Sequence, residues 1–203
     1  IITIAQSERP GLLAYLNNLG LTEVSNAAIV DIGYSATVQG YLNDLINKGI
    51  NGYYLMTRKR AEQVSSKYKV IAQGYFCHYI HPDINSPVIL RESFSLEKLL
   101  SSDDAQIVSY RQADSGDILP EFRHLADEER LSMLKRAEIR RGIMDFVNQS
   151  IMIRDKLVSD FKVPPDIAID LFEEFIAHPS QAEQDILGAL VLDDHYCGRG
   201  IVS

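Results

Sequence analysis

The feature of this sequence best suited to chemistry is an acidic residue followed by a short loop of glycine and hydroxyl residues. Asp31 ends an apolar run that is typical of a buried strand. The loop after it consists of Gly33, Tyr34, Ser35, Ala36 and Thr37. Such a loop between a strand and a helix aims backbone N–H groups and the helix dipole at one point, which favours an anion such as phosphate. Asp31 falls where open α/β sheets place ligand-handling residues, at the carboxyl end of a strand.

Several known loop types compete for this segment. A Walker A loop is excluded because no Gly-Lys-Ser/Thr follows, and a dinucleotide fingerprint is excluded because only Gly33 of its three glycines is present. The phosphate loop of actin-like ATPases joins two strands, whereas the pattern after Thr37 is helical. The loop resembles in shortened form the phosphoribosyl pyrophosphate loop of phosphoribosyltransferases, with one acidic residue instead of two. An ordinary turn, in which Asp31 and Ser35 cap the helix, remains an alternative.

Other candidate sites carry weaker signals. Cys77-His78-x-x-His81 and Asp193-Asp194-His195-x-Cys197 contain metal-ligand types without the paired-cysteine spacing of a structural zinc site. We therefore expect a buried cysteine and surface histidines, and assign no metal ligand. The Asp193-Asp194 pair would at most hold Mg²⁺ through a substrate phosphate. The basic Arg58-Lys-Arg60 would add charge beside a phosphate, although a surface cluster is the favoured interpretation.

The elements that position these residues follow from hydrophobic periodicity. A helix is predicted from Ser7 to Gly20, a strand over 27–32, a helix from Thr37 to Lys48 and a strand over 52–56. Strand, helix and strand in this order form a βαβ unit, which is nearly always a right-handed crossover. Lys69–Ile80 is predicted to hold one strand or a bent pair.

The remaining pattern is a loop, a short helix, a hairpin and then mostly helix. The loop covers 81–87, the short helix runs from Ser95 to Leu100, and the hairpin pairs 107–111 with 118–122. A long helix is predicted from Ala126 to about Phe161, followed by a second helix after Pro164-Pro165. Ser180 and Glu183 predict a capping box for a third helix that Gly188 closes.

Composition limits the class of protein. The formal net charge of −8 argues against non-specific nucleic-acid binding, and no apolar run is long enough to span a bilayer. Two cysteines are too few for a disulfide framework, so a cytoplasmic location is expected. We predict an α/β domain over 1–125 with a small, mostly parallel Rossmann-like sheet, and a helical C-terminal region over 126–203 packed on it. Because the chain opens on Ile1, we expect it to be a piece of a longer protein.

The sequence resembles a known family in several segments. Ile29–Gln39 is similar to the V-D-I-G-W-x-G-T-x-Q signature in the C-terminal half of predicted hydrolases of the haloacid-dehalogenase superfamily. Those proteins are typically encoded in bacterial surface-polysaccharide clusters and are often fused to glycosyltransferases. Further similar segments are Gly52–Leu55, Leu96–Ser102 continuing to Tyr110, and His178–Asp194. Tyr34 replaces the usual Trp, and Ala36 replaces the second Gly. The Asp-x-Asp nucleophile motif is absent, so a phosphatase half is expected upstream of Ile1.

The resemblance implies a sugar-phosphate-binding module of a glycosyl- or phosphoribosyl-transferring enzyme. Its expected partners are a sugar-phosphate donor, a glycan acceptor and the upstream haloacid-dehalogenase domain, with Mg²⁺ as a cofactor. Gly33 to Thr37 would hold the phosphate, Asp31 would contact ribose hydroxyls or a metal-bound water, and Glu97 would be a second catalytic carboxylate. The alternative is a non-catalytic module that positions a fused phosphatase or glycosyltransferase. An exposed apolar patch on the Leu131–Ile151 face would favour that alternative.

Overall fold

The chain forms two compact units. The computed structural model describes residues 2–81, 86–157, 162–194 and 200–202. Unit 1 comprises Ile1–His81 and Ala105–His124, and unit 2 comprises Pro82–Asp104 and Leu125–Ser203. The division near residue 125 lies close to the predicted domain boundary, but residues 82–104 group with the C-terminal helices rather than with the sheet. Each unit is described below by itself.

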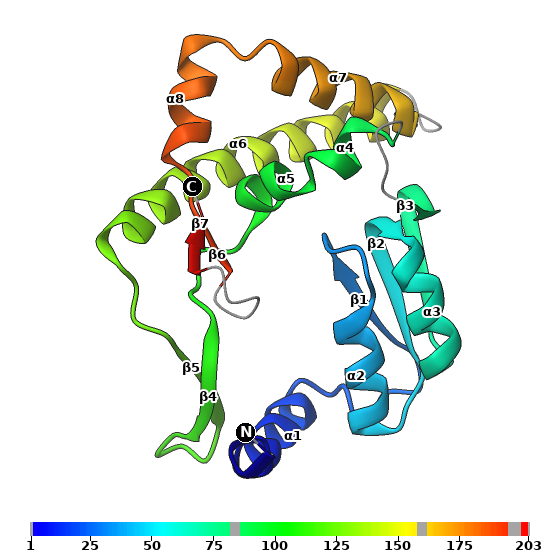
Figure 1. Ribbon diagram of the computed structural model, residues 1–203, viewed down its shortest axis with the longest axis vertical. Coiled ribbons are helices and arrows are strands. Elements are labelled where there is room, and N and C mark those ends of the chain that lie inside the picture. Colours follow the sequence, from blue (N-terminus) through cyan, green and yellow to red (C-terminus); the bar gives the residue numbers. More distant parts are fainter. Residues whose placement is uncertain (1, 82–85, 158–161, 195–199, 203) are drawn as a thin grey trace. The chain divides into compact units, whose positions relative to one another are not determined.

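Unit 1 contains a three-stranded parallel sheet in the order β1-β2-β3. Its strands are β1 (Ala27–Asp31), β2 (Ile50–Arg58) and β3 (Ile71–Ile80), and the helices between them are α2 (Thr37–Ile46) and α3 (Lys59–Tyr68). Figure 1 shows both helices on one face of the sheet. The predicted α/β class and the βαβ unit are therefore confirmed. The helix α3 was not predicted, because its buried apolar residues are only Ala61 and Val64 among charged neighbours.

The core of unit 1 lies between the sheet and these two helices. Its buried residues are Ala36, Tyr54, Ala61, Val64 and Ala72. On the strands, buried and exposed side chains alternate, as the period of two requires. The opposite face carries Val30, Tyr53 and Ile71, of which Val30 is 85% exposed. Parallel sheets are usually covered on both faces, so this apolar face is an unusual feature of the unit.

The third strand is interrupted by bulges. Tyr54 pairs with Gly74, but Met56 pairs with Cys77, so β3 uses one extra residue between the two pairs. A Cβ atom on Gly74 would overlap the carbonyl oxygen of Cys77 and lie 2.9 Å from Oγ1 of Thr57. The bulge therefore requires glycine at this position. The sequence prediction of one strand or a bent pair is resolved as a single bent strand.

The N-terminal helix packs on the hairpin. The helix is α1 (Ile2–Asn18), and the hairpin strands are β4 (Ile107–Gln112) and β5 (Ile118–Phe122). A Cβ atom on Gly11 would lie 3.0 Å from Cβ of Tyr110, so the glycine allows the helix to approach the strand closely. The hairpin was predicted. The helix begins before its predicted start at Ser7, with Pro10 inside it.

Unit 2 is mainly helical. Its elements are α4 (Val88–Arg91), α5 (Ser93–Leu100), α6 (Asp127–Leu157), α7 (Pro165–Ala177), α8 (Gln181–Ala189), β6 (Leu192–Asp194) and β7 (Gly200–Val202). Leu90 of α4 and Leu190 are completely buried. The three long helices and the capping box of α8 were predicted, although Gly188 lies within α8 rather than closing it. The helix α5 starts before Ser95, and the antiparallel pair β6-β7 was not predicted.

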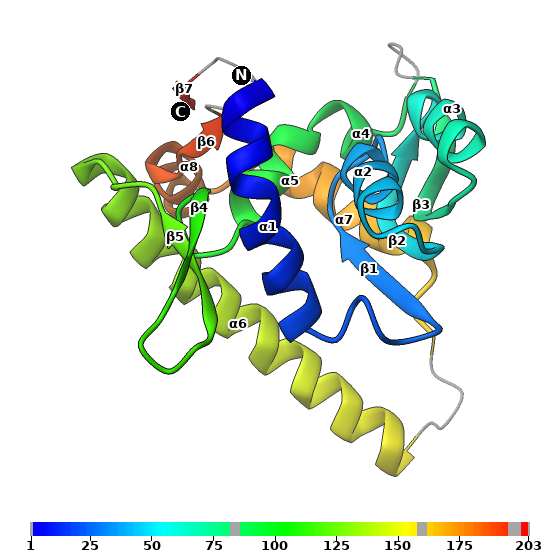
Figure 2. The same ribbon diagram turned by 90° about the horizontal axis from the view of Figure 1, so that it is seen from below.

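The two halves of α6 differ. The N-terminal half buries a polar row, Glu129, Ser132 and Arg136. Burial lowers the pKa of Arg136, while the nearby carboxylates of Asp103 and Glu129 act in the opposite direction. The C-terminal half has exposed residues almost throughout and extends beyond α5 and α8 (Figure 2). Among the described residues, no helix is long and apolar enough to cross a membrane.

Candidate functional site

The acidic residue that ends β1 fixes the start of the loop after it. The Oδ1 atom of Asp31 accepts a hydrogen bond from the backbone N–H of Gly33, with a distance of 2.8 Å between nitrogen and oxygen. This local bond forms the kind of turn that Asp favours. The amide of Gly33 is therefore engaged within the loop, whereas the sequence analysis expected it to face a phosphate. The second carboxylate oxygen, Oδ2, does not take part in this bond.

The middle of the loop is attached to the end of β2. Asp31 pairs with Tyr54 in the parallel register, and β2 continues beyond that pair to Arg58. The backbone N–H of Arg58 donates to the carbonyl oxygen of Tyr34 over 2.8 Å. The guanidinium carbon of Arg58 also lies 4.4 Å from the centre of the Tyr34 ring, which is a cation–π contact. The aromatic residue of the loop, Tyr34, therefore contacts Arg58 at the end of β2.

The loop ends in an unusual backbone conformation. Ala36 lies in the left-handed region, with φ 56°, and is almost completely buried. Glycine adopts this conformation at lower cost, and Ala36 is the position at which the resembled signature has its second Gly. The carbonyl oxygen of Ala36 accepts the first helical bond from Gly40, over 2.9 Å. No side chain caps α2, so Ser35 does not have the capping role of the ordinary-turn alternative.

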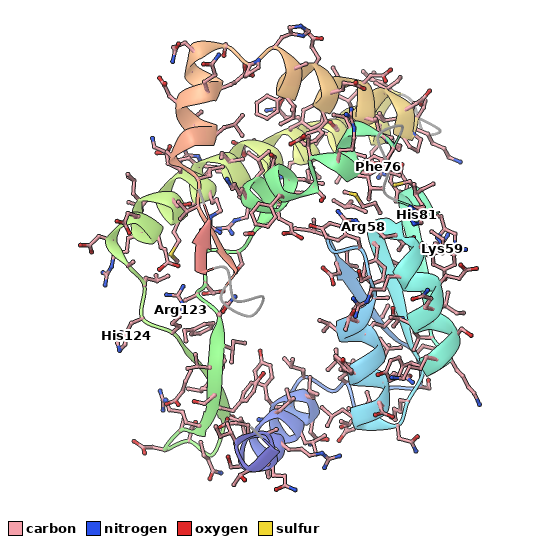
Figure 3. All side chains as sticks on the ribbon, in the orientation of Figure 1. Arg58, Lys59, Phe76, His81, Arg123 and His124 are labelled. Atoms are coloured by element: carbon pink, nitrogen blue, oxygen red, sulfur yellow. The ribbon has the colours of Figure 1, made fainter. Side chains whose placement is uncertain are left out.

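A second helix begins at the same edge of the sheet. Arg58 is the N-cap residue of α3, and no side chain caps that helix either. Lys59 follows and forms an ion pair with Glu62 in the first turn. Figure 3 shows Arg58, Lys59 and His81 together at the carboxyl ends of β2 and β3. Because helix N-termini carry partial positive charge, this edge combines two helix dipoles with the basic side chains of Arg58 and Lys59.

A buried amide holds α2 in place below the loop. The Nε2 atom of Gln39 donates to the carbonyl oxygens of Ile50 and Ile71, at 2.6 and 2.8 Å. Its Oε1 atom accepts from the Tyr54 hydroxyl over 3.0 Å. Burial raises the pKa of Tyr54, and the Asp31 carboxylate raises it further, so the phenol remains a proton donor. The last residue of the resembled signature is therefore a structural tie between α2 and two strands.

The cysteine and histidines of β3 have structural surroundings. Nδ1 of His78 accepts from the backbone N–H of Gly74 over 3.2 Å and lies 3.3 Å from Oγ1 of Thr57. Burial raises the pKa of Cys77, which favours the neutral thiol. Within the described ranges, no group of three His, Cys, Asp or Glu residues is arranged to hold a metal ion. His195 and Cys197 of the second sequence candidate lie outside the described residues.

The two predicted carboxylates belong to different units. Asp31 and the loop residues up to Thr37 lie in unit 1, and Glu97 lies in unit 2 on α5. The carbonyl oxygen of Glu97 accepts the backbone N–H of Ser101 over 2.9 Å at the end of that helix. The structure brings the loop residues together with Asp31, but the role of Glu97 stays a prediction.

Sequence reasoning underestimated Arg58. The basic triplet that begins with Arg58 was interpreted as a surface cluster, but Arg58 contacts the loop through both its backbone and its side chain. The sequence signal was its place directly after an apolar strand. Comparison of the chain with models of protein families, with curated proteins and with solved structures found no match.

Proposed function

We propose that the carboxyl edge of the unit 1 sheet binds a phosphorylated sugar. The chain would then be the sugar-phosphate-binding module of a glycosyl- or phosphoribosyl-transferring enzyme in bacterial surface-polysaccharide synthesis. One observation carries the proposal: a single short loop contains Asp31, the Tyr34 ring that the Arg58 guanidinium contacts, and the uncapped start of α2. A carboxylate suits sugar hydroxyls, while helix N–H groups and a guanidinium suit phosphate oxygens.

The residues divide between the two parts of such a ligand. The first-turn amides of α2, with the hydroxyls of Ser35 and Thr37, would receive the phosphate. Gly33, Tyr34 and Ala36 would give the loop its shape rather than supply amides, since the Gly33 N–H is already bonded to Asp31. Oδ2 of Asp31 would accept hydrogen bonds from the ribose hydroxyls. In the transfer, the bond between C1 of the ribose and the pyrophosphate oxygen would break and C1 would bond to a glycan hydroxyl oxygen, whose proton would leave with the pyrophosphate.

The residues at this edge fit Mg²⁺ only together with a ligand. Mg²⁺ is commonly held by one or two carboxylates plus substrate phosphates and water. Asp31 is the carboxylate of the loop, and one of its oxygens is already bonded to Gly33. Asp31 would therefore supply a single ligand, directly or through water, and the phosphates of the donor would supply the others. When bound, the ion would neutralise charge on the departing pyrophosphate.

The test is calorimetric titration of the chain with 5-phosphoribosyl pyrophosphate and Mg²⁺, with plain phosphate and ATP as comparison ligands. Asp31→Asn keeps an Oδ1 acceptor for the Gly33 N–H but removes the charge, so we expect a folded protein without transfer activity. Thr37→Val keeps the backbone N–H and removes the hydroxyl, and loss of one ligand hydrogen bond should weaken binding about tenfold. Thr3→Val on the exposed surface of α1 is the matched control. Absence of saturable donor binding, or full turnover by Asp31→Asn, would contradict the proposal.

A second candidate function is supported by a different observation. Exposed apolar side chains lie along the segment of α6 named in the sequence analysis: Leu131, Leu134, Ile143, Phe146, Val147 and Ile151. Phe146 is 71% exposed, and apolar patches of this kind commonly mark interaction surfaces. The chain would then be a non-catalytic module whose α6 face binds the upstream haloacid-dehalogenase domain. Protection of this face from hydrogen exchange in the longer protein would support that role.

A further inference from the structure

We infer that Arg58, which contacts the ring of Tyr34, adds a charged contact to the ligand phosphate and selects phosphorylated over unphosphorylated sugars. The inference rests on the proposed function and adds a specificity-determining residue to it. It starts from the position of Arg58, which is the last residue of β2 and the N-cap of α3.

The backbone of Arg58 is fixed on both sides. Its N–H donates to the carbonyl oxygen of Tyr34, which attaches it to the loop after Asp31. Its own extended conformation, with φ −90° and ψ 165°, turns the chain from β2 into α3. A side chain that starts from such a restrained point loses less conformational entropy when it binds a ligand. Arg58 is therefore suited to contacts that require a defined direction.

The side chain of Arg58 is restrained as well, by its contact with the ring of Tyr34. The guanidinium carbon lies 4.4 Å from the centre of the Tyr34 ring. The contact limits the positions that the guanidinium can occupy, and the N–H donors of a guanidinium lie in the plane of the group. Such a planar fork matches two oxygens of one phosphate. A lysine would keep the charge but would lose both the stacking and the two-pronged geometry.

The charge of the surroundings supports the same assignment. The chain has a formal net charge of −8, so a phosphorylated ligand needs a local positive region in order to bind. Arg58 and Lys59 lie together at this edge (Figure 3). Lys59 forms an ion pair with Glu62, and Arg58 contacts the Tyr34 ring. Arg58 is therefore the basic residue of this edge that lies against the loop.

The experiment compares four variants in titrations with ribose 5-phosphate and with ribose, at one ionic strength. Arg58→Gln removes the charge, and Arg58→Lys keeps it without the fork. Tyr34→Ala removes the ring, and Tyr34→Phe keeps the ring without the hydroxyl. Lys59→Gln is the control for a general change of charge at the same edge. Thermal unfolding of each variant shows whether it is folded.

We expect Arg58→Gln and Tyr34→Ala to weaken ribose 5-phosphate binding by about 10- to 100-fold, because a charge-assisted bond is lost or misdirected. Arg58→Lys should lose part of that affinity, while Tyr34→Phe and Lys59→Gln should stay within about twofold of the parent chain. Weak binding of ribose should be the same in all of them. This dependence on the phosphate separates recognition from a merely structural role.

Three results would overturn the inference. If the parent chain binds ribose 5-phosphate and Arg58→Gln binds it equally well, the assignment of Arg58 fails while the proposed site stands. If Lys59→Gln weakens binding as much as Arg58→Gln, the general charge of the edge explains the effect, and Arg58 does not recognise the phosphate specifically. If the parent chain binds neither ribose 5-phosphate nor 5-phosphoribosyl pyrophosphate, the proposed function and the inference both fail.

Discussion

Gln39 and Gly52 show at the scale of single residues how the sequence positions the loop. The Gln39 amide is completely buried and bonds to the backbone of two strands and to the Tyr54 hydroxyl. Such a bridge needs space between α2 and β2. Gly52 supplies this space, because any Cβ there would overlap Oε1 of Gln39 and lie 2.6 Å from the Tyr54 ring. Residues distant from Asp31 therefore set the position of the helix that starts at the loop.

Gly52→Ala should consequently destabilise the protein. The added methyl group meets a buried amide and a buried ring, and overpacking of this kind costs about 1–3 kcal/mol. The free energy of unfolding in urea measures the effect. Gly49→Ala is the matched control, since a Cβ at that position meets no atom within 4 Å, and it should change stability by less than about 0.5 kcal/mol. Equal stability of the two variants would show that Gln39 moves aside easily.

At the scale of elements, local patterns predicted part of the fold. The strands β1 and β2 and the helix α2 were predicted, because both strands contain short apolar runs and apolar residues recur in α2 with a period of 3.6. The helix α3 was missed, since its buried side chains are mainly Ala61 and Val64 and the rest of it is polar. The bulge in β3 depends on the space around Gly74. That space is bounded by the Cys77 carbonyl of β3 and by Thr57 of β2, so the sequence pattern of β3 alone does not reveal it.

The candidate site was predictable to the same extent. Asp31 and the loop follow directly from the order strand, loop, helix. The contact of Arg58 with Tyr34 depends instead on β2 running past the end of β1, and strand register is a property of the sheet rather than of either segment. The relation of Glu97 to the loop could not be inferred locally, because α5 belongs to the other unit.

The capping box of α8 implies that the local stability of this helix start depends on pH. The Ser180 hydroxyl and backbone N–H both bond to Oε2 of Glu183, at 2.7 Å each. The bond with the Ser180 hydroxyl, followed by the bond with the backbone, lowers the pKa of Glu183. A group whose pKa is lowered by folding stabilises the folded state above its unfolded pKa, and this contribution is lost as the pH falls through the folded pKa. The first turn of α8 should therefore be stable at neutral pH and should fray in acid.

Glu183→Gln should remove that pH dependence. We expect the amides at the start of α8 to exchange faster as the pH falls from about 5 to about 3 in the parent chain, after correction for intrinsic rates. In the variant the corrected rates should be nearly constant over the same range. Asp170→Asn on the exposed side of α7 is the control and should behave like the parent. An unchanged pH dependence in Glu183→Gln would show that another group titrates there.

At the scale of the whole molecule, apolar surface remains exposed on both units. In unit 1 it is the sheet face with Val30, Tyr53 and Ile71, and in unit 2 it is the C-terminal half of α6, including Phe146. Burial of apolar area is the main favourable term in folding and association. When another surface packs against such uncovered faces, their burial lowers the free energy of the system. This is the physical argument for the second candidate function, and it is compatible with ligand binding at the sheet edge.

Hydrogen exchange along α6 tests this argument. The N-terminal half buries Glu129, Ser132 and Arg136, whereas the residues after Arg140 are exposed almost throughout. Helices without tertiary packing are marginal in water, so we expect amides over 143–155 to exchange at least about tenfold faster than those over 129–139 in the chain alone. In a longer protein that contains the proposed upstream domain, this difference should shrink. Phe146→Ser should restore fast exchange there, and Leu19→Ser on the exposed surface of unit 1 should not. Equal exchange of 143–155 in both proteins would leave the accessory role without support and favour the sugar-phosphate site alone.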